Sequence, residues 1–161
     1  MVYNKSFLMA IELAHQDLDY QAVIKHIPYM EALGVELRTF GREVIFELPK
    51  ESKHLGNPIL PALHGGAIGG FMEASASLYL LMKLRLMYLP KIVDISIDYL
   101  RIGRLLPLYA DCQVVRQGTR VVNVFIKSWQ ERRDMPVATA RTHFLLMDKE
   151  LEADQTDLKS Q

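Results

Sequence analysis

The sequence predicts an α+β fold in which an antiparallel sheet curls round one long apolar helix. Three observations lead to this prediction. Residues 63–89 have the length of a helix and are apolar on almost every side, as in a helix enclosed by the rest of the chain. Two strand-like segments precede this helix and four follow it. Strands and helices do not alternate one by one, which disfavours a doubly wound nucleotide-binding fold.

A periodic apolar pattern predicts one amphipathic helix near the N-terminus. Between Ser6 and His26 the apolar residues recur every three or four positions, at Phe7, Ile11, Ala14, Leu18 and Ala22. Pro28 ends this helix because proline cannot continue one, so the N-terminal helical segment is residues 1–28. A short turn is expected over residues 29–33.

Two strand-like segments, 34–40 and 42–49, come next and are joined at Gly41 in the manner of a hairpin. Residues 50–61 contain several glycine, asparagine and proline residues and are predicted to form a loop. The long apolar helix begins after this loop, and Pro90 ends it.

The remaining strand-like segments are 91–102, 105–116, 119–130 and 136–147. In the first of them, apolar side chains alternate with polar ones, as in a half-buried strand, at Val93, Ile95, Ile97 and Tyr99. Turn residues separate the segments, so the simplest arrangement is an antiparallel meander. The polar residues 149–161 are predicted to fray.

Length and composition indicate one ordinary domain that covers residues 1–161. The chain carries 19 basic and 19 acidic residues, so its formal net charge is zero. A chain without net charge has no overall positive potential that would attract the phosphates of a nucleic acid. Nucleic-acid binding is therefore disfavoured as the main function. Neutrality together with 50% hydrophobic residues also suggests that some apolar surface is buried in an oligomer.

Composition disfavours other classes of protein as well. Cys112 is the single cysteine, which excludes an internal disulfide and a cysteine-based zinc site. The histidines lack the spacing of metal ligands, so no metal site is expected. No segment has the roughly 18 uninterrupted apolar residues of a membrane span. No signal peptide is recognised in residues 1–17, so a cytoplasmic protein is expected.

One acidic residue interrupts the long apolar helix. Glu73 is the only charged residue of segment 65–82, and carboxylates are seldom left in such a helix without a partner or a function. Helical periodicity places three residues on the same face as Glu73, namely Gly66, Gly70 and Ser77. Two explanations stand side by side: a catalytic carboxylate, or a buried one paired with strand N–H groups or with an arginine such as Arg141.

Four glycines near the start of this helix imply that some group approaches its backbone closely. Glycine costs roughly 1 kcal/mol relative to alanine in a helix, yet positions 65, 66, 69 and 70 are all glycine. The approaching group is a ligand or a neighbouring helix, including one across a dimer interface. Unpaired N–H groups at a helix start can stabilise the oxyanion formed from an ester or thioester. Glu73 can then act as general base on water or as the attacking carboxylate, with Ser77 orienting it.

The segment LHGGAIGGFMEASAS resembles the signature of the hotdog-fold acyl-CoA thioesterases of the PaaI type. In that family an HGG turn opens the central helix and an Asp or Glu follows nine residues after the histidine; here these are His64, Gly65, Gly66 and Glu73. The resemblance extends over nearly the whole chain, through IPYMEALGVELRTF, ISIDYLRIGR and ATARTHFLLM. It implies a hotdog fold with an extra N-terminal helix.

The resemblance also implies roles for these residues. Gly65 would hold the oxyanion through its backbone N–H, with Gly66 beside it, and Glu73 would be the catalytic carboxylate. Ser77 matches the position of a helper hydroxyl in related hydroxybenzoyl-CoA thioesterases. The family further implies a homodimer or homotetramer with active sites at the subunit interface, so that Gly65 and Glu73 come from different subunits. It implies no metal or redox cofactor.

One position departs from the family pattern. Six residues before the histidine the family commonly has Asn or Gln, whereas this chain has Pro58, and the neighbouring Asn57 is expected to serve instead. His64 is expected to fix the turn beside the substrate rather than to act as a base.

Arginines near the turns are candidates for binding the nucleotide end of coenzyme A, because guanidinium groups suit its phosphates. The best candidates are Arg101, Arg104 and Arg120; ordinary charged turns are the alternative. The sequence thus predicts an enzyme that hydrolyses an acyl-CoA to free acid and coenzyme A. The alternative, kept open by Pro58, is a catalytically silent hotdog domain that binds acyl-CoA as a sensor or scaffold.

Overall fold

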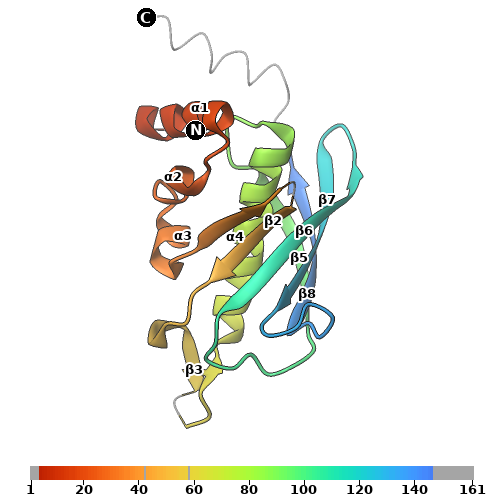
Figure 1. Ribbon diagram of the computed structural model, residues 1–161. Coiled ribbons are helices and arrows are strands. Elements are labelled where there is room, and N and C mark those ends of the chain that lie inside the picture. The colour runs from red at the N-terminus through yellow and green to blue at the C-terminus, as the bar shows by residue number, and fades with distance from the viewer. Residues whose placement is uncertain (1–3, 42, 58, 147–161) are drawn as a thin grey trace, which may run out of the picture.

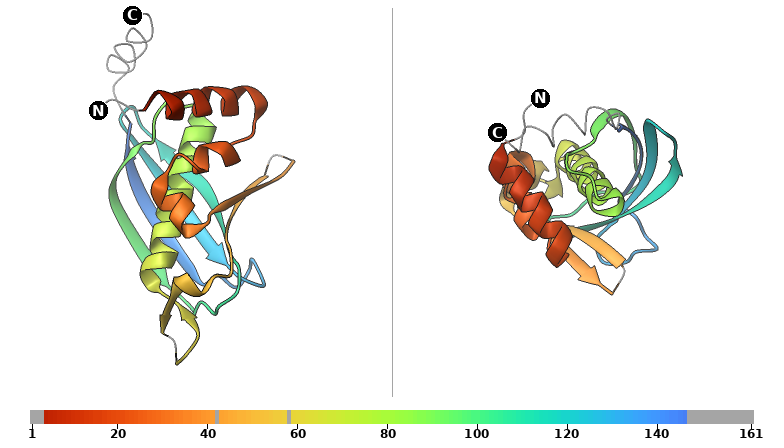
Figure 2. Two further views of the ribbon diagram at one scale, coloured as in Figure 1. Left: turned by 90° about the vertical axis from the view of Figure 1, so that its left-hand side faces the viewer. Right: turned by 90° about the horizontal axis from the view of Figure 1, so that it is seen from above.

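The computed structural model describes residues 4–41, 43–57 and 59–146 (Figure 1). Pro58 and the polar segment 149–161, which the sequence predicts to fray, lie outside the described residues. The predicted α+β arrangement is confirmed: a long helix, α4 (Gly65–Leu84), lies against a six-stranded antiparallel sheet. Seen from above, α4 is enclosed between the sheet and the N-terminal helices (Figure 2).

The N-terminal segment forms three helices rather than the predicted one: α1 (Lys5–Asp17), α2 (Gln21–Ile24) and α3 (Pro28–Leu33). The break follows α1 at Leu18, which adopts a left-handed conformation with φ 59°. Asp19 then accepts a 3.1 Å hydrogen bond from the N–H of Gln21 at the start of α2. Pro28 begins a helix instead of ending one, because the first helical residue needs no N–H donor.

The predicted hairpin at Gly41 is confirmed, with β1 (Glu36–Phe40) and β2 (Glu43–Leu48) pairing in antiparallel register. Gly41 has φ 63°, the left-handed region that a tight hairpin turn requires and that glycine adopts most easily. The predicted loop 50–61 contains a one-turn helix, Ser52–His54, and the short strand β3 (Leu55–Asn57). β3 pairs with β4 (Ala62–Leu63), which follows the loop.

The last four strands are β5 (Lys91–Tyr99), β6 (Leu108–Gln117), β7 (Val121–Trp129) and β8 (Ala138–Leu145). The strand order is β1-β2-β6-β7-β8-β5. The predicted meander is therefore correct for β6 to β8 and wrong for β5, which pairs with β8 at the far edge of the sheet. In this position β5 completes the wrapping of α4, with Ile92, Ile95 and Ile97 partly buried against the core (Figure 2).

Two local details of the helix and of β5 differ from the pattern predicted for them. α4 ends at Leu84, with Arg85 in a left-handed conformation at φ 52°, before Pro90 is reached. A bulge lies between Ile92 and Asp94 in the pairing of β5 with β8, and Val93 is 64% exposed instead of sharing the buried face.

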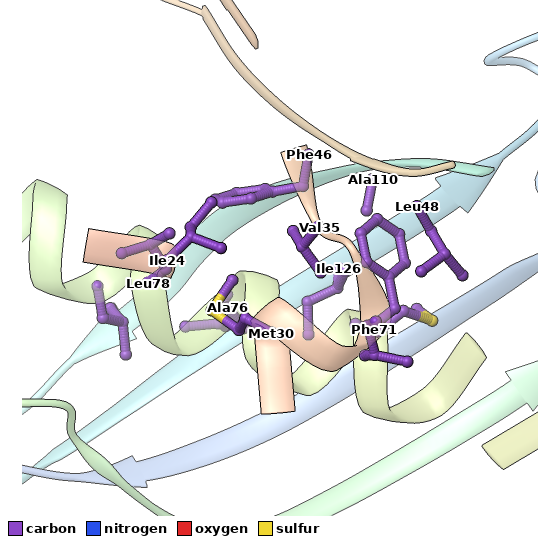
Figure 3. Close-up of a cluster of buried hydrophobic side chains, with 14 of the residues drawn as sticks. Ile24, Met30, Val35, Phe46, Leu48, Phe71, Ala76, Leu78, Ala110 and Ile126 are labelled. Carbon is purple, nitrogen blue, oxygen red and sulfur yellow. The ribbon is translucent and has the colours of Figure 1, made fainter. Parts of the chain in front are cut away.

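The hydrophobic core lies between α4, the inner face of the sheet and the helices α2 and α3 (Figure 3). Phe71 of α4 and Phe46 of β2 are both fully buried in it. α4 contributes core residues from several sides, as its apolar sequence predicts, and the largest of these are Phe71, Met72, Leu78, Leu80 and Leu81.

Replacing Phe71 with alanine is expected to lower the free energy of unfolding by about 3–5 kcal/mol, because it leaves a cavity in a close-packed core. Urea denaturation followed by circular dichroism measures this change. Leu13, which is 54% exposed on α1, provides the matched control, and Leu13→Ala is expected to have little effect. Equal losses for the two variants would contradict the assigned core.

Candidate functional site

The start of α4 is fixed by His64. Its Nδ1 accepts a 2.9 Å hydrogen bond from the N–H of Gly66, so His64 is the N-cap of the helix. The His64 N–H in turn donates to the carbonyl of His54 at 2.8 Å. These bonds give His64 the turn-fixing position expected for it.

Of the two glycines predicted to stabilise an oxyanion, the structure leaves one N–H available. The N–H of Gly66 is used by the His64 cap, whereas the N–H of Gly65 meets no acceptor among the described residues. The Gly65 carbonyl accepts a 2.7 Å hydrogen bond from the hydroxyl of Tyr99, which attaches the helix start to the end of β5. The arrangement aims one free backbone donor out of the helix N-terminus.

At the next two glycines of α4, side chains from other elements of the same chain pack closely against the helix backbone. A Cβ at Gly69 would lie 2.8 Å from Cδ1 of Ile97 on β5. A Cβ at Gly70 would overlap the hydroxyl of Tyr29 on α3. The close approach implied by the sequence is therefore made, at these two positions, by a strand and by a short N-terminal helix.

Glu73 lines a pocket of about 260 Å³ on the side of α4 that faces α3. Gly70 and Ser77 line the same pocket, so the predicted helical face is confirmed for these three residues, while Gly66 lies outside the lining. The other lining residues are mostly apolar and come from the start of α3, the segment before β5, β5 itself and β8. They include Ile27, Met30, Leu89, Pro90, Ile92 and Phe144.

The carboxylate of Glu73 is half-buried and has no hydrogen bond or ion pair with any described residue. Arg141, the partner considered as an alternative, lies on the outer face of the sheet and forms a 3.5 Å ion pair with Asp98. An acidic group without a salt bridge in a mostly apolar pocket is suited to accept a proton or to attack an electrophile.

Tyr29 also lines this pocket, although the sequence predicts a turn at this position. It belongs to the short helix α3 and lines the pocket together with Glu73. Its position over Gly70 could have been inferred only from the helix that Pro28 begins, because the contact joins residues 41 positions apart in sequence.

Adding a methyl group at Gly70 is expected to displace Tyr29. Gly70→Ala should therefore lower the midpoint of thermal unfolding, and Tyr29→Ala should relieve most of that loss in the double variant. Differential scanning calorimetry of the two single variants and the double variant measures the coupling. Additive effects would show that Tyr29 does not occupy this place.

Gly65 and Glu73 of one chain lie far apart along α4. They are eight residues apart on α4, which corresponds to about 12 Å along the helix axis. Reacting atoms must lie about 3–3.5 Å apart. This separation favours a donor at Gly65 and a base at Glu73 that come from two copies of the chain.

The side chain of Asn57 forms hydrogen bonds within its own loop. Its Oδ1 accepts hydrogen bonds from the N–H groups of Ile59 and Leu60, at 2.9 and 3.2 Å. Gly56, the preceding residue, packs against His64, so Asn57 lies at the same end of α4 as Gly65. The structure thus brings Asn57 near the helix start with its acceptor oxygen already engaged.

The three predicted coenzyme A ligands do not form one cluster. Arg101 and Arg104 lie at the end of the sheet where β5 and β7 finish, and they line a small pocket of about 100 Å³ together with Arg132. Arg120 lies in the turn between β6 and β7, at the opposite end of β7. A nine-residue strand spans roughly 30 Å, so Arg120 does not share a phosphate site with the other two within one chain.

All three arginines of the Arg101–Arg104 pocket already have partners, and Arg132 forms a 2.5 Å ion pair with Asp134. Arg101 donates to the carbonyl of Pro136 at 2.8 Å, and Arg104 forms a 2.9 Å ion pair with Glu131. Across the ranges that the structure describes, no group of three or more His, Cys, Asp or Glu side chains could hold a metal ion. No helix in those ranges is long and apolar enough to cross a membrane.

Comparison with known proteins connects this geometry to a family. A profile of the thioesterase superfamily matches residues 60–137, which contain all of α4. Among solved structures, a protein from Chromobacterium violaceum is 40% identical, and the match covers 86% of this chain and 96% of that chain with a TM-score of 0.70. No curated protein matches this chain.

Two more distant structures share the fold. The PaaI protein from the phenylacetic acid degradation operon of E. coli is 18% identical over 76% of this chain and 90% of its own, with a TM-score of 0.64. A thioesterase from Haemophilus influenzae is 21% identical over 73% of this chain and 81% of its own, with a TM-score of 0.65. The chain therefore belongs to the thioesterase superfamily and has the PaaI-type hotdog fold.

Proposed function

We propose that this protein is an acyl-CoA thioesterase in which Glu73 of one subunit and Gly65 of another act on the same thioester. The observation that carries this proposal is the half-buried carboxylate of Glu73, which has no salt bridge among the described residues and lies in a pocket of mostly apolar residues on α4. Membership of the thioesterase superfamily supports the reaction class.

The open edge of β5 supports assembly of two copies. One side of β5 pairs with β8, and the other has no strand partner among the described residues. Exposed apolar side chains lie at and just beyond the end of this strand, at Tyr99, Leu100 and Ile102. An unpaired edge that carries apolar groups is a template for pairing with a second chain.

Antiparallel pairing of two β5 strands would build the shared site. Along one chain, Tyr99 at the end of β5 contacts Gly65, whereas Ile92 near its start lines the pocket of Glu73. A twofold axis at the middle of β5 places the Tyr99 end of one copy beside the Ile92 end of the other. Gly65 of each subunit is then adjacent to Glu73 of the second subunit, and each dimer has two such sites.

The reaction follows from the groups at each site. The free N–H of Gly65 donates to the thioester carbonyl oxygen and stabilises the negative charge that develops there. Glu73 either removes a proton from water, which adds to the carbonyl carbon, or adds to that carbon itself to give an anhydride that water then cleaves. In both routes the C–S bond breaks and coenzyme A leaves as the thiol. Ser77, one turn after Glu73 and in the same pocket, would orient the water or the carboxylate.

The acyl group and the nucleotide occupy different places in this proposal. The apolar wall around Glu73 suits an acyl group without charge, and Tyr29 and Met30 of α3 limit its size. Arg101 and Arg104, at the same end of α4 as Gly65, would hold the phosphates of coenzyme A together with Arg132. Arg120 would not contribute within the same chain.

Release of thiol from a panel of short, long and aromatic acyl-CoAs tests this function. Hydrolysis of at least one of them, with an uncharged acyl group preferred over succinyl-CoA, is the expected result. Absence of turnover across the panel would overturn the proposal.

A silent acyl-CoA-binding domain is the second candidate. The observation that favours it is the engagement of the Asn57 oxygen by its own loop, which leaves that oxygen unable to orient a water molecule. Tight binding of a non-hydrolysable acyl-CoA thioether, together with no turnover of the panel, would identify this second function.

A further inference from the structure

The sheet is split between β2 and β6. The two strands pair only from Phe46–Ala110 to Leu48–Leu108, although β2 begins at Glu43 and β6 continues to Gln117. Beyond these pairs the strands diverge, and the β1–β2 hairpin projects away from the rest of the sheet (Figure 2). A cavity of about 720 Å³ lies in this split, a size typical of small-molecule sites.

Apolar and polar side chains line the split cavity in similar measure. They come from β1, β2, β6, β7 and the end of α4, with the corner between α1 and α2 at one end. The apolar and aromatic members include Leu18, Val44, Tyr79, Met82, Cys112 and Phe125. Burial raises the pKa of Tyr79 and raises that of the Cys112 thiol well above its ordinary value, so both groups stay protonated at neutral pH. An apolar chain can therefore pack against Tyr79 and Cys112 without burying a charge on either side chain.

The split cavity is separate from the pocket of Glu73. The two have no lining residue in common. Tyr79 is six residues beyond Glu73 on α4, which turns the two side chains about 120° apart round the helix. A molecule in the split cavity thus lies on another face of α4 and does not occupy the proposed acyl pocket.

The rim of the split cavity has more positive than negative charge. Its two acids, Glu43 and Asp111, are both engaged by Arg133, which spans the split and pairs with one strand on each side. Lys83 and Lys127 also lie on the rim, and neither has an acceptor within the described part of the chain. These two ammonium groups are available to an anion.

We propose that the split cavity is a second binding site, for an amphipathic carboxylate with an unbranched apolar chain. The chain would lie along the wall formed by Met82 and Cys112, and the carboxylate would pair with Lys83 and Lys127. A free acid of this class is also the product of the proposed hydrolysis, so the site would respond to product. Only this last link depends on the proposed function.

Cys112 provides a direct reporter of occupancy, because it is the only cysteine of the chain and lies in the cavity wall. Alkylation of the intact protein by a maleimide is followed by mass spectrometry at mildly alkaline pH, where the raised pKa of the thiol still permits slow reaction. Decanoate at ten times its dissociation constant is expected to slow the alkylation about tenfold. Decanol and decyltrimethylammonium, which lack the negative charge, are expected to protect much less.

Substitutions test where the carboxylate of decanoate binds and whether this site is distinct from the proposed active site. Lys83→Met and Lys127→Met should each weaken decanoate binding about fivefold. Lys25→Met, at the exposed residue that follows α2, should leave decanoate binding unchanged, and so should Glu73→Gln.

Failure of decanoate to protect Cys112, equal protection by decanol, or loss of protection in Glu73→Gln would overturn the second site. The measurement contains no thioester, so absence of hydrolysis does not affect its outcome. Circular dichroism of each variant shows whether the fold is retained.

Discussion

Replacing Glu73 with glutamine is expected to lower kcat for acyl-CoA hydrolysis by about 10²- to 10⁴-fold while KM changes little. Glutamine has nearly the same volume, so the 260 Å³ pocket and its apolar wall remain. Only the ability to take up a proton or to attack the carbonyl carbon is lost. Steady-state release of thiol measures both constants.

Glu31→Gln is the matched control for this variant, since Glu31 is exposed on α3 next to the same pocket wall. It should hydrolyse acyl-CoA at the rate of the unmodified protein. Full activity of Glu73→Gln would refute the proposed mechanism, and equal losses in both variants would point to a general effect of charge.

Replacing Gly65 with proline is expected to lower kcat by about 10²- to 10³-fold, because it removes the N–H that stabilises the oxyanion. Proline is well tolerated at the first position of a helix, where the N–H has no helical acceptor. His64 has φ −67° and ψ 131°, the extended conformation that a residue before proline requires. The variant therefore deletes one donor and keeps the backbone.

Gly65→Ala retains the N–H and is the control. Its Cβ would lie 3.4 Å from the ring of Tyr99, which is ordinary contact, so most activity should remain. If proline and alanine reduce kcat equally, the N–H of Gly65 has no special role.

The two inactive variants together test whether the site is shared. A mixed dimer of Glu73→Gln and Gly65→Pro contains one site with both intact groups and one site with neither. Random reassortment of equal amounts should therefore restore about a quarter of the activity of the unmodified protein. No recovery after verified exchange of subunits would show that each site belongs to a single chain.

The fold was predictable wherever one residue pattern determines one local structure. The apolar segment of α4 and the alternation in β6 to β8 are patterns of this kind. The place of β5 was not, because its alternation is satisfied equally beside β6 or beside β8, and only the need to enclose α4 selects β8. The break after α1 was hidden because Leu18, a residue with no turn preference, adopts the left-handed conformation.

The candidate site was likewise predictable only where a local sequence pattern determines the position of a residue. Helical periodicity was sufficient to place Gly70, Glu73 and Ser77 on one face. It could not show that His64 takes the N–H of Gly66, nor that Tyr29 closes over Gly70, since both depend on three-dimensional contacts. The separation of Arg120 from Arg101 and Arg104 likewise follows from strand direction and not from their closeness in sequence.

Under the proposed pairing of two β5 strands, each chain would fold before it becomes active. Trp129 is the only tryptophan and is 7% exposed within a single folded chain, so its fluorescence reports the folding of one copy. The proposed active site does not exist until two copies meet. During refolding from urea, tryptophan fluorescence should therefore return at a rate independent of concentration, whereas activity should return faster as the chain concentration rises.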